Sequence, residues 1–266
     1  MHNYLRIALI VFIYTYISAC TQSNEQSQTS QAEQTEETST TTVSEPSDAT
    51  TQNEQHILFF GDSITAGYGL DVEQAFPALI QEKITAENLP FRVTNGGLSG
   101  ETSSGGLNRI DWLLNQPVDI FILELGGNDG LRGVPLDLTA SNLQSILDRV
   151  KEKNPEASLV VAGMQIPPNL GPDYTNQFKS LYPTLAENNS ATLIPFILDG
   201  VAGDESLNLP DGIHPTAEGH SIVAETVWNT LHPIMEERVA DAGDCSIPED
   251  FTAAPEEDCE IDPAQF

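Results

Sequence analysis

Two short segments of the sequence carry side chains that could together perform nucleophilic catalysis. The first segment, residues 61–69, reads GDSITAGYG and places Ser63 directly after an apolar run. The second segment reads DGIH and contains Asp211 and His214. A serine hydroxyl becomes an effective nucleophile when a histidine accepts its proton and a carboxylate orients the histidine ring. We therefore expect Ser63 as the nucleophile, His214 as the general base and Asp211 as the group that orients the base.

Acyl transfer also requires hydrogen-bond donors for the negative charge that develops on the substrate carbonyl oxygen. Gly100 lies in a glycine-rich loop, where the absence of a side chain lets a backbone N–H approach a substrate. Asn128, in the sequence GGND, offers a side-chain amide. Together with the backbone N–H of Ser63, these two groups form the oxyanion hole that the sequence predicts. Asp62 and Asp129 are expected to bond neighbouring loop amides rather than to transfer protons.

The loops that carry these residues follow short apolar runs that alternate with segments of helical periodicity. Continuous apolar runs of this length are typical of parallel strands that are covered on both faces. The pattern predicts an α/β domain of three layers, α/β/α, around a five-stranded parallel sheet. The expected strands are Ile57 to Phe60, Phe91 to Asn95, Ile120 to Leu123, Leu159 to Ala162 and Leu193 to Leu198.

Two of the expected strands have features of sheet edges. The second strand contains the polar Arg92, and the last contains Pro195, which cannot donate to a hydrogen-bond ladder. These features favour the strand order 2-1-3-4-5. In a sheet of this kind ligands bind beyond the carboxyl ends of the strands, near the point where the strand order reverses.

Several aromatic side chains outside these motifs are assigned no chemistry. Trp112 and Trp228 fall in amphipathic segments, and we expect both in the core. His56, His220 and His232 have no catalytic partner in the sequence, so we expect them to be packing or surface residues.

The charge of the chain excludes some classes of partner. The 266 residues include 40 acidic residues and 10 Lys plus Arg, which gives a net charge of -30. This charge repels phosphate backbones and anionic membrane surfaces, so we expect no nucleic-acid partner. The composition divides the chain into a leader at 1–19, a polar and disordered tether at 20–55, a domain at 56–235 and an acidic tail at 236–266.

The N-terminal segment resembles the leader of bacterial lipoproteins. An apolar run at residues 7–17 follows Arg6 and is too short to span a bilayer as a mature helix. The sequence ISAC, which ends at Cys20, resembles the lipobox, whose cysteine is lipidated and becomes the new N-terminus. The resemblance implies an exported lipoprotein that is anchored to a membrane, and Thr21 favours the outer membrane if the source has two. The alternative is an ordinary signal peptide that contains a cysteine.

The acidic tail contains two cysteines, Cys245 and Cys259. In an oxidising exported compartment these thiols can form a disulfide. Two free thiols are the alternative reading. The spacing of cysteines and histidines does not match a zinc site, and no metal is predicted.

The catalytic motifs together resemble the SGNH (GDSL) hydrolase superfamily, because Ser63, Gly100, Asn128 and His214 match its four conserved blocks. The stretches NGGLSGETSSGGLNRI, ILELGGNDGLRG, GMQIPPNLG and LPDGIHPTAEGH are similar to its periplasmic thioesterase, lysophospholipase and arylesterase branch. The likeness covers nearly all of residues 57–235 and implies a flavodoxin-like fold. The acidic tail and the lipid anchor depart from the pattern of that branch.

The resemblance implies a serine esterase that hydrolyses acyl esters or thioesters without a metal or organic cofactor. Lysophospholipids and aryl or fatty-acyl esters are the candidate substrates, and we expect a monomer. Leu131, Pro168, Asn169 and Leu170 correspond to positions that border the acyl pocket in this branch.

Two other functions are compatible with the sequence. A carbohydrate O-acetyl esterase would share the chemistry but would prefer acetyl groups to longer chains. A tethered binding lipoprotein would have an inactive fold, but the complete set of catalytic residues argues against it.

Overall fold

The computed structural model of the protein describes residues 54–243. The predicted leader, the lipidation site Cys20, most of the tether and the pair Cys245 and Cys259 lie outside the described residues. Within the described part, none of the helices is long and apolar enough to cross a membrane.

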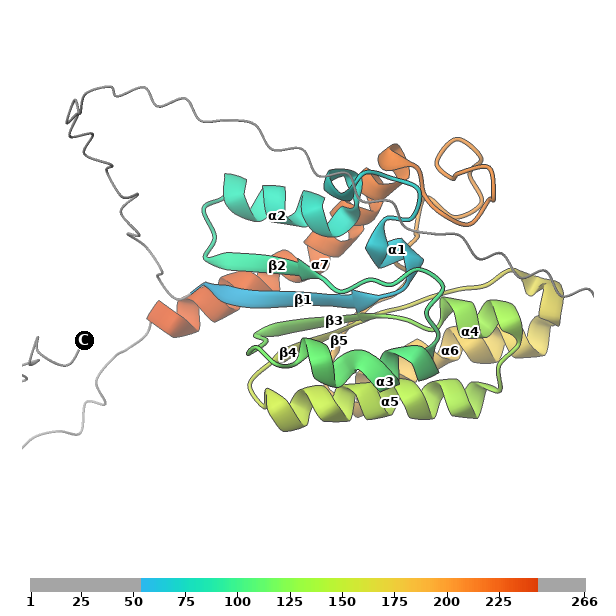
Figure 1. The fold of residues 1–266 in the computed structure, drawn as a ribbon, viewed down its shortest axis with the longest axis horizontal. Helices are drawn as coiled ribbons and strands as arrows, with labels where there is room; N and C mark the ends of the chain where they lie inside the picture. The colour runs from blue at the N-terminus through green and yellow to red at the C-terminus, as the bar shows by residue number, and fades with distance from the viewer. Residues whose placement is uncertain (1–53, 244–266) are drawn as a thin grey trace, which may run out of the picture. The chain divides into compact units, whose positions relative to one another are not determined.

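Five parallel strands form one sheet in the predicted order, β2-β1-β3-β4-β5 (Figure 1). All five residues of β3 are buried because helices cover both faces of the central strands. The half-polar β2 forms one edge of the sheet, as its arginine predicted, and β5 forms the other. The strands are β1 (Gln55–Gly61), β2 (Phe91–Asn95), β3 (Ile120–Glu124), β4 (Ser158–Ala162) and β5 (Thr192–Ile194).

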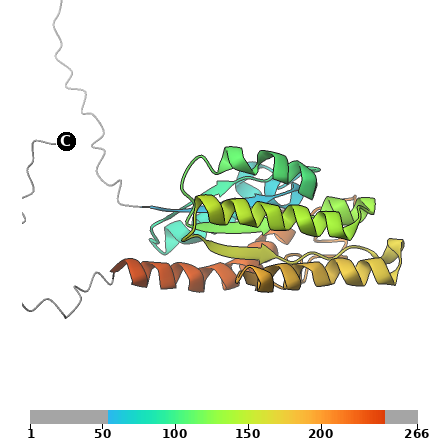
Figure 2. The same cartoon turned by 90° about the horizontal axis from the view of Figure 1, so that it is seen from below.

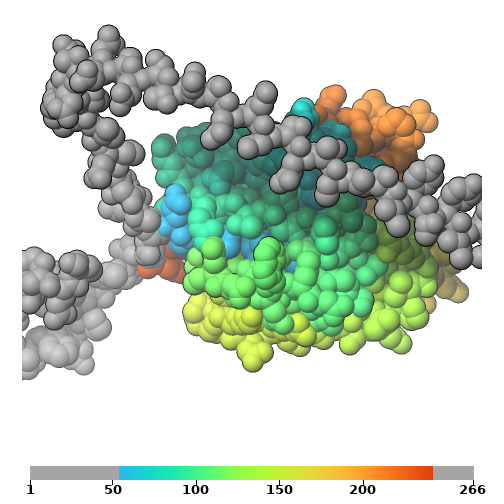
Figure 3. All heavy atoms as spheres, viewed as in Figure 1, coloured from blue at the N-terminus to red at the C-terminus, as the bar shows by residue number. Residues whose placement is uncertain are grey.

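Helices cover both faces of the sheet and complete the three predicted layers. On one face α2 (Phe76–Ala86) packs against α7 (Ala217–Gly243), and on the other α5 (Leu136–Lys153) packs between α3 (Ser103–Leu113) and α6 (Pro172–Asn188). Right-handed crossovers between parallel strands produce this distribution. In the space-filling view, little of β1, in blue, reaches the surface (Figure 3).

The last strand is shorter than the sequence predicted, because β5 ends at Ile194 and not at Leu198. Pro195 follows directly, and its ring nitrogen has no hydrogen to donate to the ladder. The chain therefore leaves the sheet at this point. Phe196 and Leu198 line a cavity instead of extending the strand.

Trp112 is not in the core, because its side chain is 74% exposed. Helix α3 buries Gly106 and Ile110 on the face that packs against the sheet. Trp112 lies two positions after Ile110, which is about 200° around an α-helix. It therefore faces solvent, whereas Trp228 packs against the core as expected.

The two ends of the described segment lie at the amino edge of the sheet. Helix α7 continues to Gly243, beyond residue 235, where the domain was expected to end. Arg238 on this helix donates hydrogen bonds to Gln55 in β1 and Ser158 in β4, and it pairs with Asp119 just before β3. Figure 2 shows the red end of α7 and the blue start of β1 at the same end of the domain.

His220 is buried between α7 and the start of α2. Its side chain is 1% exposed, and its Nδ1 accepts a hydrogen bond of 3.2 Å from the backbone N–H of Phe76. The two rings stack with their centroids 6.1 Å apart. Burial, with a smaller effect of His214, lowers the pKa of His220 to about 4. The packing role predicted for this histidine is therefore confirmed.

We expect mild acid to destabilise the fold through His220. Its pKa is 6.5 in the unfolded chain and about 4 in the folded protein, so only the unfolded state gains this proton as the pH falls through that interval. His220→Asn keeps a hydrogen-bond acceptor but does not titrate. Between pH 7 and pH 4.5, the wild type should lose about 2 kcal/mol more free energy of unfolding than the variant. Urea unfolding measures this difference, and equal losses would contradict the assignment.

Candidate active site

Ser63 is the first residue of α1 (Ser63–Ala66), immediately after β1. Asp62 caps this helix, because its Oδ1 accepts a hydrogen bond of 3.1 Å from the backbone N–H of Ile64. Gly67 ends the helix with a φ of 72°, in the left-handed region that favours glycine. This sharp turn from strand to helix presents Ser63 at the carboxyl edge of the sheet.

The structure brings Ser63, His214 and Asp211 into one chain of hydrogen bonds. Ser63 Oγ lies 2.8 Å from His214 Nε2, and His214 Nδ1 lies 2.7 Å from Asp211 Oδ2. When Nδ1 carries the proton, His214 donates to Asp211 and offers Nε2 to accept the proton of Ser63. The arrangement therefore fits the activation of a serine nucleophile.

Asp211 is held by the same loop that carries His214. Its Oδ1 accepts hydrogen bonds from the backbone N–H groups of Ile213, at 2.9 Å, and His214, at 3.0 Å. Hydrogen bonds from the backbone and ring of His214 and the backbone of Ile213 lower the pKa of Asp211 to about 2. An antiparallel bridge between Asn208 and Pro215 closes the loop. Asp211 is thus ionised at neutral pH and fixed beside the imidazole.

Tyr68 is a neighbour of the site that sequence reasoning missed. Its ring packs on the imidazole of His214 with the centroids 4.5 Å apart, and its backbone N–H donates to the carbonyl of Ser63 at 3.0 Å. The ring therefore restrains the imidazole from one side. The sequence around Tyr68 does not indicate this contact, because Tyr68 and His214 lie in loops that are far apart in the sequence.

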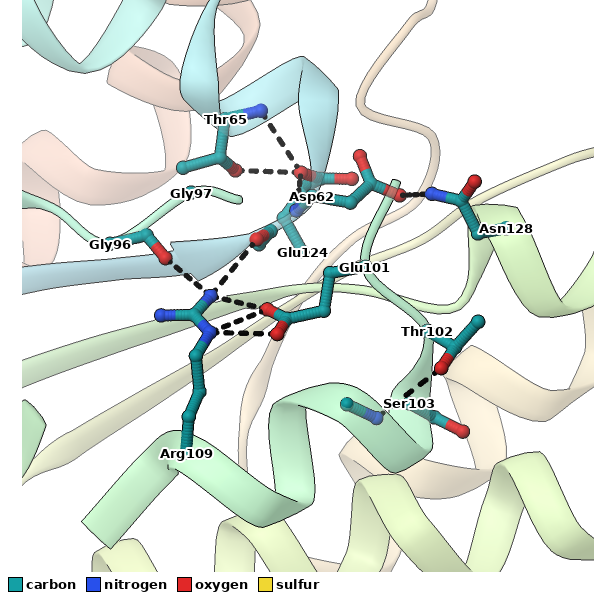
Figure 4. Close-up of polar contacts among 12 residues, drawn as sticks. Asp62, Thr65, Gly96, Gly97, Glu101, Thr102, Ser103, Arg109, Glu124 and Asn128 are labelled. Atoms are coloured by element: carbon teal, nitrogen blue, oxygen red, sulfur yellow. Dashed lines mark hydrogen bonds and ion pairs between the residues drawn. The ribbon is translucent and has the colours of Figure 1, made fainter. Parts of the chain in front are cut away.

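Asn128, in α4 (Gly127–Arg132), is held at both ends of its amide group. Its Nδ2 donates to Asp62 Oδ2 at 3.2 Å, and its Oδ1 accepts from Arg132 Nη2 at 3.3 Å. Figure 4 shows the amide of Asn128 directed at the carboxylate of Asp62. Arg132 also donates to the carbonyl of Gly100 at 3.2 Å, so it links the two loops that were expected to form the oxyanion hole.

Arg132 had no assigned role in the sequence analysis, although it lies in the GGNDGLRG stretch. Its role depends on the parallel order of the sheet, which makes the loop after β2 a neighbour of the loop after β3. Gly100, its partner in the first loop, has a φ of 79°, a conformation that favours glycine.

Asp62 and Asp129 both bond backbone amides of neighbouring residues, which confirms the sequence prediction. Asp129 is buried, and its two oxygens accept hydrogen bonds from the backbone N–H of Ser103 at 2.8 Å and from the Ser103 hydroxyl at 2.6 Å. This contact fixes the start of α3 against α4. Residues 54–243 contain no group of acidic, histidine or cysteine side chains that could hold a metal ion.

A cavity of about 540 Å³ opens beside Ser63 and His214. Leu131 lines this cavity, as predicted, whereas Pro168, Asn169 and Leu170 form the short helix η2 (Pro168–Leu170) and are not among its lining residues. The segment just before η2 takes their place. The apolar walls of the cavity are formed by Ile64, Leu131, Met164, Ile166, Pro167, Phe196, Leu198, Ala202 and Ile213.

A second hollow, of about 630 Å³, lies between α5 and α6. Its walls include Leu136, Ala140 and Leu181, but none of the candidate catalytic residues. The smaller cavity is therefore the candidate active site, because only there do a nucleophile, a base and an apolar wall converge.

Comparison with known families agrees with this geometry. Residues 59–222 match the GDSL-like Lipase/Acylhydrolase family. The chain belongs to this family. Esterase TesA of Pseudomonas aeruginosa is 39% identical over 182 residues, which cover 68% of this chain and 90% of that protein. Thioesterase 1/protease 1/lysophospholipase L1 of Escherichia coli is 36% identical over 180 residues, which cover 67% of this chain and 84% of that protein.

Solved structures of the family have the same fold. The crystal structure of TesA has a TM-score of 0.65 at 39% identity, and the match covers 68% of this chain and 99% of that one. The psychrotrophic esterase EstA from Pseudoalteromonas sp. has a TM-score of 0.65 at 32% identity, with the same coverage of 68% and 99%. The SGNH hydrolase fold inferred from the sequence is therefore confirmed.

We expect Arg132→Met to lower the kcat of ester hydrolysis by about fivefold to tenfold, with little change in KM. The hydrogen bonds of this exposed guanidinium to Asn128 and Gly100 contribute about 1 kcal/mol to the alignment of the donors. Arg149→Met is the matched control, because Arg149 bonds Leu107 and Asp111 on the far side of α3. Initial rates on p-nitrophenyl butyrate measure both variants. Equal kcat values for the two variants would mean that Arg132 does not align Asn128 and Gly100.

Proposed function

We propose that this protein hydrolyses acyl esters or thioesters with Ser63 as the nucleophile, His214 as the base and Asp211 as its orienting partner. The observation that carries the proposal is the chain of hydrogen bonds of 2.8 Å and 2.7 Å that joins these three side chains beside an apolar cavity. The names of the relatives, which include esterase, arylesterase and thioesterase/lysophospholipase, support the same class of reaction.

In the first half of the reaction, Ser63 Oγ attacks the acyl carbonyl carbon while His214 Nε2 takes the hydroxyl proton. The carbonyl electron pair moves to oxygen, where the N–H groups of Ser63 and Gly100 and the amide of Asn128 stabilise the charge. When the tetrahedral intermediate collapses, the bond to the leaving oxygen or sulfur breaks and His214 donates its proton to that atom.

Water completes the reaction. It attacks the acyl group on Ser63 as His214 accepts one of its protons, and the second tetrahedral intermediate then collapses. The bond to Ser63 Oγ breaks, Oγ regains a proton from His214, and a carboxylic acid leaves. Ser63, Asn128 and His214 line the cavity, and Gly100 is linked to Asn128 through Arg132.

The shape and chemistry of the cavity favour acyl chains longer than acetyl. Its volume is about 540 Å³, and side chains such as Met164, Ile166 and Leu198 form walls without charge. An acyl chain placed against these walls would lose contact with water, which contributes about 0.8 kcal/mol for each buried methylene. Fatty-acyl and aryl esters and lysophospholipids are the substrates that we propose.

We further propose that the protein acts as an exported monomer that is anchored to a membrane through a lipid on Cys20. The lipobox-like ISAC sequence supports the anchor, and the net charge of -30 argues against electrostatic attachment to anionic lipid. Cell fractionation tests the anchor: the wild type should be found with membranes and Cys20→Ala should not. Equal distribution of the two proteins would exclude this anchor.

The proposed function predicts that Ser63→Ala abolishes ester hydrolysis and leaves the fold intact. Initial rates on p-nitrophenyl esters from acetyl to palmitoyl should be highest for medium or long chains in the wild type. The rates of the variant should fall by at least about a thousandfold, since the residual binding and oxyanion groups cannot replace the nucleophile. Retained activity would exclude Ser63 as the nucleophile, and a preference for acetyl would favour a deacetylase.

Filling the cavity should shorten the preferred acyl chain. Ala202 lines the cavity at an exposed position, so Ala202→Phe adds a ring without disturbing the core. The ratio of kcat/KM for octanoyl and acetyl esters should fall by about fourfold to fifteenfold, which is the size expected when one or two methylenes are excluded. Ala140→Phe fills the other hollow and should leave the ratio unchanged. If Ala202→Phe lowered kcat/KM equally for the octanoyl and acetyl esters, the cavity would not be the binding site of the acyl chain.

A further inference from the structure

Glu124 is a buried carboxyl group that has no role in the mechanism above. It is the last residue of β3, its side chain is 0% exposed, and it pairs in register with Gly61 at the end of β1. Its side chain therefore lies under the turn that carries Ser63.

One oxygen of Glu124 holds this turn. Oε2 accepts hydrogen bonds from the hydroxyl of Thr65 at 2.6 Å, from the backbone N–H of Thr65 at 3.2 Å and from the backbone N–H of Asp62 at 3.3 Å. The other oxygen, Oε1, is buried and has no hydrogen-bond partner among the described residues. A buried acceptor without a partner destabilises the fold, and the cost is larger when the group is charged.

The charges around Glu124 do not favour a carboxylate. The ionisable neighbours of Glu124 include Asp62, which is itself buried, and Tyr182, whose hydroxyl bonds the carbonyl of Leu125 at 3.2 Å. Arg109, at the same edge of the sheet, is occupied by the carboxylate of Glu101, to which both its Nε and Nη2 donate (Figure 4). A buried carboxylate with an acidic neighbour and no cation is strongly disfavoured.

Asp62 is the acidic neighbour of Glu124. The backbone N–H of Asp62 donates to Glu124 Oε2 at 3.3 Å, so the two residues are in direct contact. Asp62 Oδ2 in turn accepts a hydrogen bond from the side-chain amide of Asn128. Burial, first, and then the charge of Asp62 raise the pKa of Glu124 well above its usual range, and burial raises the pKa of Asp62 to about 6.

We propose that Glu124 is a positioning residue that works as a neutral carboxylic acid. Its carbonyl oxygen, Oε2, accepts the three hydrogen bonds of the Ser63 turn, and its hydroxyl, Oε1, donates to the carboxylate of Asp62. Asp62 then holds one amide hydrogen of Asn128, so that the other is directed into the cavity. A single proton on Glu124 thereby couples the nucleophile turn to the oxyanion donor. The inference rests on the proposed function for its effect on catalysis.

Glu124→Gln is the deciding variant, because glutamine has the shape of a protonated glutamate. Its amide oxygen can accept the same three hydrogen bonds, and its NH₂ group can donate to Asp62. We expect this variant to fold, to keep kcat within about threefold of the wild type and to keep the pH profile of kcat. Glu124→Met has a similar length but no polar atoms, and its kcat should fall at least about tenfold because the turn and Asp62 lose these bonds.

Glu101→Gln is the matched control. Glu101 is also buried, but it forms an ion pair with Arg109. Glu101→Gln should therefore lower the midpoint of thermal unfolding more than Glu124→Gln does. Infrared difference spectra of wild type minus Glu124→Gln should contain the C=O stretch of a protonated carboxyl group at neutral pH. This reading does not depend on activity, so it separates failure of this inference from failure of the proposed function.

Three results would overturn the inference. The first is a carboxylate band in place of the protonated band, and the second is failure of Glu124→Gln to fold. The third is a loss of kcat of tenfold or more in a folded Glu124→Gln protein, which would mean that the negative charge of Glu124 is required.

Discussion

The pairing of β1 with β3 is the constraint on which the site depends. Gly61 and Glu124 lie opposite each other at the carboxyl ends of these two central strands, so the turn to Ser63 and the turn to α4, which carries Asn128, begin side by side. A side chain at position 61 has no space, because its Cβ would lie 2.5 Å from Glu124 Oε2. The proposed nucleophile and the proposed oxyanion donor therefore follow directly on two strands that are buried on both faces.

His214, the proposed base, is positioned by contacts of its own loop and of Tyr68. His214 follows the edge strand β5, and its loop is held by its own contacts: Asp211 bonds the backbone and the ring of His214, and Tyr68 packs on the ring. Part of the cavity wall also follows β5. The strand ends before Pro195, and Phe196 and Leu198 line the cavity. The site therefore joins residues that follow buried central strands to residues that lie on loops.

Much of this arrangement could be predicted from the sequence, because it depends on local patterns. Continuous apolar runs indicated the central strands, and a histidine shortly after an aspartate in one loop indicated the base and its partner. Contacts between segments distant in the chain left no such pattern: Tyr68 on His214, Arg132 between two loops, and Glu124 beneath the nucleophile turn. The prediction of a buried Trp112 was wrong, because the size and apolar character of a side chain do not determine which face of the helix it lies on.

We propose that Ser63 is the one activated nucleophile among the described residues. The most direct test is intact-mass analysis after treatment with an alkyl p-nitrophenyl phosphonate, followed by peptide mapping. We expect a single adduct on the peptide that contains Ser63 and no adduct in Ser63→Ala. Ser99 lies in the loop after β2, and labelling should be unchanged in Ser99→Ala. Labelling of the Ser63→Ala protein at the wild-type rate, or an adduct on another residue, would contradict it.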